Sequence, residues 1–316
     1  MAEHSTPVAG IDTGKTWLDI ALWPDGATWR VPNTAEGHRA LRERLAGLGV
    51  RRAGIEASGG YERAVAAALR GAGVEVAVLQ PGQVRAFAAY KLRRAKNDRI
   101  DAALIAGCAA GLAGVRAAPD PRMAPLAEHL LFIEQIEDDL RQTRCRLERF
   151  AARRLRAGLE RDVQRLERRR DAELALLLKT VRAEADLARR LDLVASVDGV
   201  GIRTALTLVV LMPELGALSR EQAAALAGLA PFDRDSGTLR GERHIAGGRG
   251  RVRKALFNAA LPAAFRWNDN LVPVYKTLVA KGKPHKKALV ACARKLVIFV
   301  NAVLARGTPW TKQIPV

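Results

Sequence analysis

The sequence contains few cysteines: its 316 residues include only Cys108, Cys145 and Cys292. These three lie far apart and lack the close spacing of metal-binding pairs, which argues against a disulfide framework and against a zinc site. Reduced thiols in a cytoplasmic protein are the interpretation that fits best.

Long apolar runs are also missing. The polar start, MAEHSTPVAG, lacks the hydrophobic core of a signal peptide. The run ALTLVVLM is too short to span a bilayer, and Arg294 and Lys295 interrupt ALVACARKLVIFV. We therefore expect a soluble cytoplasmic protein that has no membrane partner.

Acidic side chains are scarce relative to basic ones. The 33 Asp and Glu residues face 52 Lys and Arg residues, which gives a formal net charge of +19 and a pI near 10.8. Such an excess usually indicates a polyanionic partner such as nucleic acid. The alternative is a basic protein from an arginine-rich proteome, but the clustering of the charge argues against it.

The first hundred residues predict an α/β sheet with helices on its faces. Three short strand-like runs come first, separated by the tight links TGKT and PDGA, as in an antiparallel meander. Alternating helices and strands follow, and Thr34 is the expected N-cap of the first helix. The order β-β-β-α-β-α-β-α is also that of the ribonuclease H-like fold. The predicted strands are PVAGID, WLDIALW, ATWRV, RRAGIEA and VEVAVLQ.

Glycine almost vanishes between about 124 and 192, where apolar residues recur three or four apart. This spacing predicts a long helix or helical hairpin, which could be an intramolecular pair or an intermolecular coiled coil. We therefore divide the chain into an α/β domain at 1–115, a helical segment at 116–192 and a mainly helical domain at 193–316. The fold class is thus α/β plus all-α.

Two glycine-containing segments of the last domain are candidates for nucleic-acid contact. In SVDGVGIRTALTLVV, Gly199 and Gly201 precede a helix, as in a helix-hairpin-helix element that offers backbone amides to phosphate. A simple tight turn is the alternative. The second segment is the glycine-rich loop PFDRDSGTLRGERHIAGGRG.

The stretch VAGIDTGKT resembles a phosphate-binding loop but is one residue short, because only three residues separate Gly10 from Gly14. Asp12 also stands where phosphate oxygens would have to lie. It ends the first strand, and Glu56 ends a later one in GIEASGGYER. Carboxylates at the same end of a sheet suggest a shared cation.

Asp98 and Asp101, in KNDRIDAALIA, share one face at the start of a predicted helix. With Asp12 and Glu56 they make four carboxylates that can hold hard cations such as Mg²⁺. Two such ions form a known clamp for phosphodiester displacement. Each carboxylate also has a structural alternative: a turn cap, an ion pair with arginine, or a helix N-terminal residue.

Ser236, in FDRDSGTLRG, is a candidate nucleophile. A serine that attacks phosphate needs a base and nearby cations, and this one has two aspartates before it and several arginines around it. A solvated hydroxyl in a Gly-Ser turn is the alternative. The neighbouring charged residues are Asp233, Arg234, Asp235, Arg240, Arg243 and Arg249.

In these residues the sequence resembles the DEDD transposases of the insertion-sequence one-ten family, whose relatives include the Piv-type DNA invertases. The resemblance runs from about residue 8 to 310 and is weakest in the arginine-rich helical middle. The segments that carry it are GIDTGKTWLDIAL, GIEASGGYER, QPGQVRAFAAYKLRRAKNDRIDAALIA and LAGLAPFDRDSGTLRGERHIAGGRGRVRKALFNAAL.

The resemblance implies a RuvC-like first domain whose Asp12, Glu56, Asp98 and Asp101 bind Mg²⁺, with Mn²⁺ as a substitute. It implies that Ser236 attacks DNA to form a covalent phosphoserine link before strand exchange and rejoining. It also implies a structured bridge RNA that pairs with donor and target DNA, and a homo-oligomer, either dimer or tetramer. Expected contacts with nucleic acid are Lys15, Arg93, Arg94, Lys96, Gly199, Gly201, Arg240, Arg243 and Arg249.

Three other classes of protein are weighed against this hypothesis. A RuvC-like hydrolytic nuclease, such as a junction resolvase, would use the four carboxylates without the serine. An actin-like ATPase or sugar kinase opens with a similar G-I-D-x-G strand, but a second such strand is missing from this sequence. A nucleic-acid-binding protein with a degenerate site would not need the four carboxylates to be intact.

Overall fold

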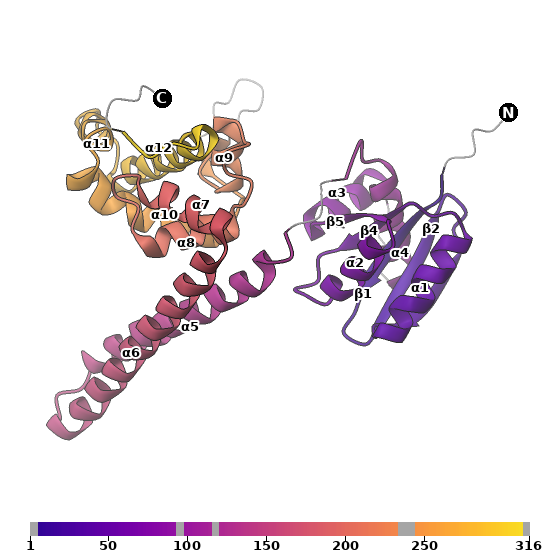
Figure 1. Cartoon of the computed structure of the whole chain (residues 1–316), viewed down its shortest axis with the longest axis horizontal. Coiled ribbons are helices and arrows are strands. Elements are labelled where there is room, and N and C mark those ends of the chain that lie inside the picture. The colour runs from indigo at the N-terminus through magenta and orange to yellow at the C-terminus, as the bar shows by residue number, and fades with distance from the viewer. Residues whose placement is uncertain (1–5, 93–97, 116–119, 233–243, 312–316) are drawn as a thin grey trace. The chain divides into compact units, whose positions relative to one another are not determined.

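The computed structural model describes residues 6–92, 98–115, 120–232 and 244–311, and the side-chain surroundings of 98–100 lie outside that description. The chain forms two compact units, Met1–Pro119 and Asp120–Val316 (Figure 1). The first is a mixed α/β unit and the second is built mainly from helices. The predicted fold class of α/β plus all-α is therefore confirmed at this level.

The first unit contains a five-stranded sheet with the order β3-β2-β1-β4-β5. The first three strands pair antiparallel as the predicted meander, and β1, β4 and β5 pair parallel. The strands are β1 (Val8–Thr13), β2 (Trp17–Trp23), β3 (Thr28–Pro32), β4 (Arg52–Glu56) and β5 (Glu75–Leu79).

Helices cover both faces of this sheet. Thr34 caps the first helix through a hydrogen bond from the Gly37 N–H, as predicted. One apolar core joins the sheet to α1 and α2, and a smaller one joins it to α3 and α4. Because both faces are covered, β1 reads as an almost continuous apolar run that ends at Asp12. The helices are α1 (Ala35–Gly47), α2 (Glu62–Gly71), α3 (Pro81–Tyr90) and α4 (Asp98–Ala110).

The second unit begins with a long helical hairpin of α5 (Met123–Leu147) and α6 (Arg153–Ala183). The buried residues of α5 recur every three or four positions, which is the spacing of one helix face. They are Met123, Leu126, Leu130, Ile133, Ile136, Leu140 and Thr143. The two helices pack within one chain, so the predicted hairpin is confirmed, while a coiled coil between chains stays a prediction. The division of 116–316 into two domains also stays a prediction.

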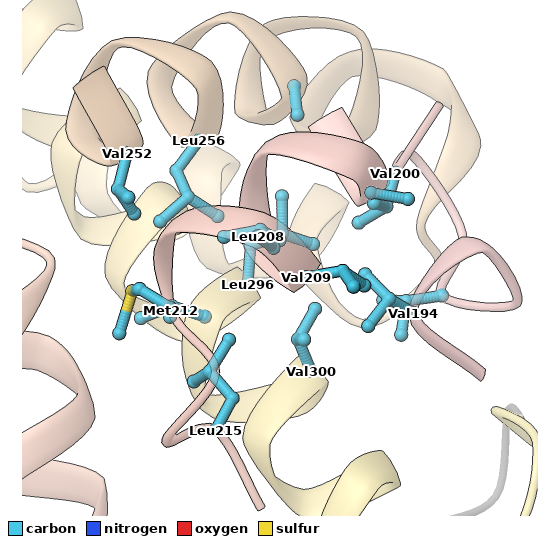
Figure 2. Packing of buried hydrophobic residues seen from close by; sticks show 14 of the residues in the cluster. Val194, Val200, Leu208, Val209, Met212, Leu215, Val252, Leu256, Leu296 and Val300 are labelled. Carbon is cyan, nitrogen blue, oxygen red and sulfur yellow. The ribbon is translucent and has the colours of Figure 1, made fainter. Parts of the chain in front are cut away.

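The rest of this unit packs around one apolar core, part of which Figure 2 shows. Leu208 and Val209 of α8 lie in it with Leu296 and Val300 of α12. The elements are α7 (Ala185–Ala195), α8 (Ile202–Leu211), α9 (Arg220–Leu226), β6 (Pro231–Phe232), β7 (His244–Ile245), α10 (Gly250–Pro262), the π-helical turn η1 (Ala263–Trp267), α11 (Leu271–Ala280) and α12 (His285–Arg306).

Among the described helices, α12 is long and apolar enough to cross a membrane by length and composition, and 56% of that stretch is buried inside the protein. Its buried residues, such as Leu296 and Val300, belong to the core just described. Packing in the core therefore accounts for the apolar composition of α12.

Candidate active site

Helix α4 lies directly against the sheet, over two glycines. A Cβ atom on Gly10 of β1 would lie 2.1 Å from the carbonyl oxygen of Ala102 and 2.2 Å from the nitrogen of Ala106. A Cβ atom on Gly54 of β4 would lie 2.7 Å from the Ala109 Cβ. Only glycine allows this approach of helix backbone to strand backbone.

The direction of α4 follows from contacts near its end. The Arg52 Nη1 donates to the carbonyl oxygen of Leu112 at 2.9 Å, so the end of α4 lies beside the start of β4. Gly107 lies next to Trp23 at the end of β2, which pairs with the start of β1. The N-terminal turn of α4, with Asp98 and Asp101, therefore lies toward the carboxyl ends of β1 and β4.

Asp12 and Glu56 belong to the same face of the sheet as α4. Side chains alternate between faces along a strand, so Asp12 shares the face of Gly10 and Glu56 shares the face of Gly54. The parallel register pairs Gly10 with Gly54, which places the two carboxylates on neighbouring strands at one edge. Both side chains are half-buried, as is that of Asp101.

The structure thus brings three of the four predicted carboxylate positions, Asp12, Glu56 and Asp101, to one edge and one face, while the side chain of Asp98 lies outside the description. Carboxylate oxygens are the ligands that Mg²⁺ prefers, so the donor chemistry fits that ion. Among the described side chains, no group of three or more His, Cys, Asp or Glu is arranged to hold a metal.

The loops at this edge are tied to one another. The hydroxyls of Thr13 and Ser58 lie 2.6 Å apart and link the ends of β1 and β4. The Glu62 carboxylate accepts hydrogen bonds from the Ser58 N–H, the Ser58 hydroxyl and the Gly60 N–H. Burial raises the pKa of Glu62, but these backbone and side-chain hydrogen bonds outweigh it, and the pKa lies below its ordinary value.

Asn33 holds the turn that contains Lys15. Its Nδ2 donates to the carbonyl oxygens of Gly14 at 2.9 Å and Tyr61 at 3.3 Å, joining the β1–β2 turn to the loop after β4. Its Oδ1 lies 2.7 Å from the Nε2 of the buried His38. Lys15 is exposed in this turn, next to the carboxylate edge, and its contact with nucleic acid stays a prediction.

Ser236 lies between two short paired strands of the second unit. Strands β6 and β7 pair Phe232 with His244 and Pro231 with Ile245, and residues 233–243 between them lie outside the described part of the chain. The predicted contacts Arg240 and Arg243 fall in the same segment, and Arg93, Arg94 and Lys96 fall in another such segment.

Two glycines form the base of this serine loop, which we define as residues 231–245. A Cβ atom on Gly248, whose φ is +66°, would lie 2.2 Å from the nitrogen of Gly228. The Arg253 Nη1 donates to the carbonyl oxygens of Gly228 and Gly247. The backbone on both sides of the loop is therefore held together.

The Arg249 side chain is hydrogen-bonded within the protein near the base of the serine loop and does not extend freely into solvent. Its Nη1 donates to the Leu211 carbonyl oxygen and to the Glu214 carboxylate, both at 2.7 Å. A second bond runs from its Nη2 to the same carboxylate. The guanidinium predicted to contact nucleic acid thus anchors the start of α10 to the segment after α8.

The glycine hairpin at 196–201 has the predicted form of a turn followed by a helix. Gly201 is the N-cap of α8, and Gly199 has φ +91° with Ala263 so close that a Cβ would lie 2.4 Å from it. The buried Asn268 donates to the Asp198 carbonyl oxygen at 2.9 Å and fixes the hairpin. The hairpin and the exposed Trp267 line a pocket of about 380 Å³.

The sequence alone does not single out several of these residues. Isolated glycines inside strands, such as Gly10 and Gly54, are a known sign of close backbone approach and could have been identified. The roles of Asn33, Asn268 and Arg253 depend on partners distant in the sequence, and nothing in their local pattern indicates them.

Two family models match this chain. One, a DEDD-type IS110 model described as Transposase, matches residues 9–153, which include the carboxylate edge. The other, described as Transposase IS116/IS110/IS902 family, matches residues 191–276, which include the glycine hairpin and the serine loop. The first match covers most of the first unit and continues through α5 of the second, and the other match lies wholly in the second unit.

Curated proteins show the same resemblance over shorter stretches. An uncharacterized 43.6 kDa protein of insertion element IS110 from Streptomyces coelicolor is 33% identical over 122 residues, covering 38% of this chain and 30% of that protein. Pilin gene-inverting proteins of Moraxella lacunata and Moraxella bovis are each 29% identical over 137 residues, covering 42% of each chain. The matched stretches thus span less than half of these relatives.

Proposed function

This chain belongs to the IS110 family of transposases, and we propose that it cuts and rejoins DNA with Ser236 as nucleophile and a Mg²⁺-binding carboxylate site. The reaction is a phosphodiester transesterification that moves or inverts a DNA segment. The substrates are a donor and a target duplex, and the charge of +19 suits such polyanions.

The observation that carries this proposal is the shared edge of Asp12 and Glu56. They stand on neighbouring parallel strands, on the face that α4 covers, and α4 begins at Asp98 with Asp101 in its first turn. Carboxylate oxygens are the ligands that Mg²⁺ prefers, and a bound cation would offset the negative charges that these segments bring to this edge.

In the proposed site, Asp12, Glu56, Asp98 and Asp101 hold Mg²⁺, which supplies charge stabilisation for a phosphodiester. The protein's own part is to fix those carboxylates. Gly10 and Gly54 seat α4 against the strands, and Thr13 with Ser58 joins the strand ends. Lys15 contacts the phosphate backbone from the adjoining turn.

Ser236 provides the covalent step. Its Oγ attacks a DNA phosphorus atom, a bond from phosphorus to one sugar oxygen breaks, and that oxygen leaves as a hydroxyl. The reverse attack by a sugar hydroxyl of another strand releases the serine and rejoins the DNA. Arg240 and Arg243 stabilise the negative charge that develops on the phosphate. A base takes the serine proton, and the departing sugar oxygen takes up a proton to become that hydroxyl.

A structured bridge RNA that pairs with both duplexes is part of the proposal, as is a homo-oligomer in which α5 and α6 make contacts between subunits. The hairpin at Gly199 and Gly201 is proposed to bind backbone phosphate through amides at the start of α8. The exposed Trp267 beside that hairpin supports a nucleic-acid contact there.

The decisive experiment traps the covalent adduct on labelled DNA carrying the ends of the element and the flanking noncoding RNA. The wild-type protein should form a protein–DNA adduct, and Ser236→Ala should not. Thr238→Ala, two residues away in the same loop, is the matched control and should keep the adduct. An adduct that persists in Ser236→Ala would overturn the serine assignment, and free-ended cleavage there would instead favour the hydrolytic nuclease.

The carboxylate site has a separate test that needs no DNA. Mg²⁺ should raise the melting temperature of the wild-type protein but not that of Asp12→Asn. Asp25→Asn is the control, because Asp25 is exposed in the β2–β3 turn at the opposite edge of the sheet. An equal Mg²⁺ effect on all three proteins would contradict metal binding at Asp12.

A further inference from the structure

An exposed group of aromatic rings lies beside lysines on the second unit. Phe265 of η1, 51% exposed, packs edge-on against Tyr275 with the ring centres 4.9 Å apart. It also stacks on the exposed His285 at 5.9 Å with an interplanar angle of 18°. These three rings come from η1, α11 and the start of α12 and form one cluster.

The cluster is held in place before any ligand arrives. The Tyr275 hydroxyl and the His285 Nδ1 are joined by a hydrogen bond of 2.6 Å. The two rings are nearly perpendicular, with an interplanar angle of 87°. A rigid aromatic surface loses little conformational entropy when a ligand stacks on it.

The surroundings of the cluster are strongly basic. Asp269 is the last acidic side chain in the sequence, so none follows it through residue 316. Exposed lysines occur between Tyr275 and His285 in the sequence and directly after His285, and within the described residues Lys281, Lys283 and Lys286 take part in no ion pair. The first turn of α12 carries basic residues and no acidic one, although the helix dipole favours the reverse.

We propose that Phe265, Tyr275 and His285, with Lys281, Lys283 and Lys286, form a surface that binds unpaired nucleotides. We call it the aromatic–lysine surface. An aromatic ring stacks on the flat face of a base, and that face is accessible only where the strand is not in a stacked duplex. Lysines beside the rings meet the phosphates between successive bases.

This surface deepens the proposed function, because strand exchange exposes unpaired bases that must be held until they are rejoined. The same stacking chemistry serves single-stranded DNA and single-stranded RNA. The proposal concerns binding alone, so it does not depend on Ser236 as nucleophile.

The test measures binding of the full-length protein to labelled oligonucleotides of about 12 nucleotides by fluorescence anisotropy. One sequence is used as single-stranded DNA, single-stranded RNA and duplex DNA. Phe265→Leu keeps an apolar side chain but removes the ring, and should weaken single-strand binding about 5- to 100-fold. Phe265→Tyr should restore it, and duplex binding should change little in either variant.

Two more variants complete the experiment. Phe150→Leu removes another half-exposed ring, at the tip of the α5–α6 hairpin, and should leave binding unchanged. The double variant Lys281→Gln with Lys283→Gln should lower the slope of log affinity against log salt by about 1.4 for single strands. The sugar preference follows from comparing the DNA and RNA oligonucleotides, either of which satisfies the proposal.

Equal losses of single-strand and duplex binding in Phe265→Leu would overturn stacking on unpaired bases. So would binding to vesicles of phosphatidylserine and phosphatidylcholine that Phe265→Leu abolishes while single-strand binding is kept. Failure of the surface leaves adduct formation by Ser236 intact, and loss of the adduct in Ser236→Ala leaves single-strand binding intact, so the two proposals fail separately.

Discussion

Gly10 and Ala106 are in backbone contact: a Cβ atom at position 10 would lie 2.2 Å from the Ala106 nitrogen. No side-chain movement can relieve such a clash, because both partners are main chain. The position of α4 beside Asp12 and Glu56 therefore requires glycine, which has no Cβ atom, at position 10. Residue 10 contributes by having no side chain, whereas Asp12, two residues further along β1, is proposed to act through its charge.

Gly10→Ala should destabilise the first unit by about 1 to 3 kcal/mol, because α4 must shift away from β1. The shift also separates Asp101 from Asp12, so the Mg²⁺-dependent rise in melting temperature should shrink. Gly82→Ala in α3 is the control, since a Cβ there meets nothing within 4 Å. It should stabilise the protein by about 0.5 to 1 kcal/mol. If urea unfolding shows equal changes in the free energy of unfolding for Gly10→Ala and Gly82→Ala, the close approach of α4 to β1 is contradicted.

Glu62→Gln should make stability less dependent on pH. The folded-state pKa of Glu62 lies below its ordinary value of 4.5, so its contribution is fully present above that pH and is lost as the pH falls through the lowered pKa. Wild type should therefore exceed the variant in stability at pH 7 and lose that advantage on acidification below 4.5. Thermal melting between neutral and acid pH tests this, and a constant difference would contradict it.

Arg203 and Glu137 should be energetically coupled. The Arg203 Nε and Nη2 donate to the two Glu137 oxygens at 2.9 and 3.0 Å, joining α8 to α5. A double-mutant cycle with Arg203→Met and Glu137→Gln should give a coupling of about 1 kcal/mol. The exposed pair of Arg165 and Asp162 on α6 should give about 0.3 kcal/mol. If the coupling energy of Arg203 and Glu137 is no larger than that of the control pair, their contact does not stabilise the packing of α8 on α5.

Arg249→Lys should destabilise the second unit by about 1 to 2 kcal/mol, because a lysine cannot make the bidentate contact with Glu214. The salt dependence of DNA binding should stay as in wild type in a second variant, Arg249→Gln, which removes the charge. Thermal melting and DNA titrations at several salt concentrations measure both effects. A smaller salt slope in Arg249→Gln would support the phosphate contact that the sequence predicts for this residue.

Asn268→Asp should loosen the hairpin of Gly199 and Gly201 selectively. Its Oδ1 still accepts from the Asn270 and Leu271 N–H groups, but the donor to the Asp198 carbonyl oxygen is lost. Asn268→Leu removes both the side-chain donor and the side-chain acceptor, and should lower the free energy of unfolding by about 2 to 3 kcal/mol. Hydrogen exchange of the 198–201 amides should rise in both variants. Unchanged exchange in Asn268→Asp would contradict the fixing role of this bond.

The sequence predicted the elements whose signals are local. The meander, the β-α alternation and the Thr34 cap all follow from patterns within a few residues, and the structure has them. The shared edge of Asp12 and Glu56 also follows, because strand ends at one side of a parallel sheet must meet. These are the parts of the fold that periodicity and turn chemistry determine.

What escaped prediction depends on tertiary contact. Arg249 lies in a basic stretch and reads as surface charge, yet Glu214, 35 positions away, occupies it. Asn268 reads as a turn residue, yet it is fully buried and bonded to Asp198. No local pattern specifies such partners, because they are chosen by the packing of the whole unit.

The pairing of Phe232 with His244 has a consequence for how the family can diversify. When the two ends of a segment are already joined, doubling its length adds only about 0.6 kcal/mol of closure entropy. Segments of other lengths should therefore join these paired strands at little cost in closure entropy. Chimaeras joined at positions 232 and 244 would inherit the host's fold and the donor's loop chemistry.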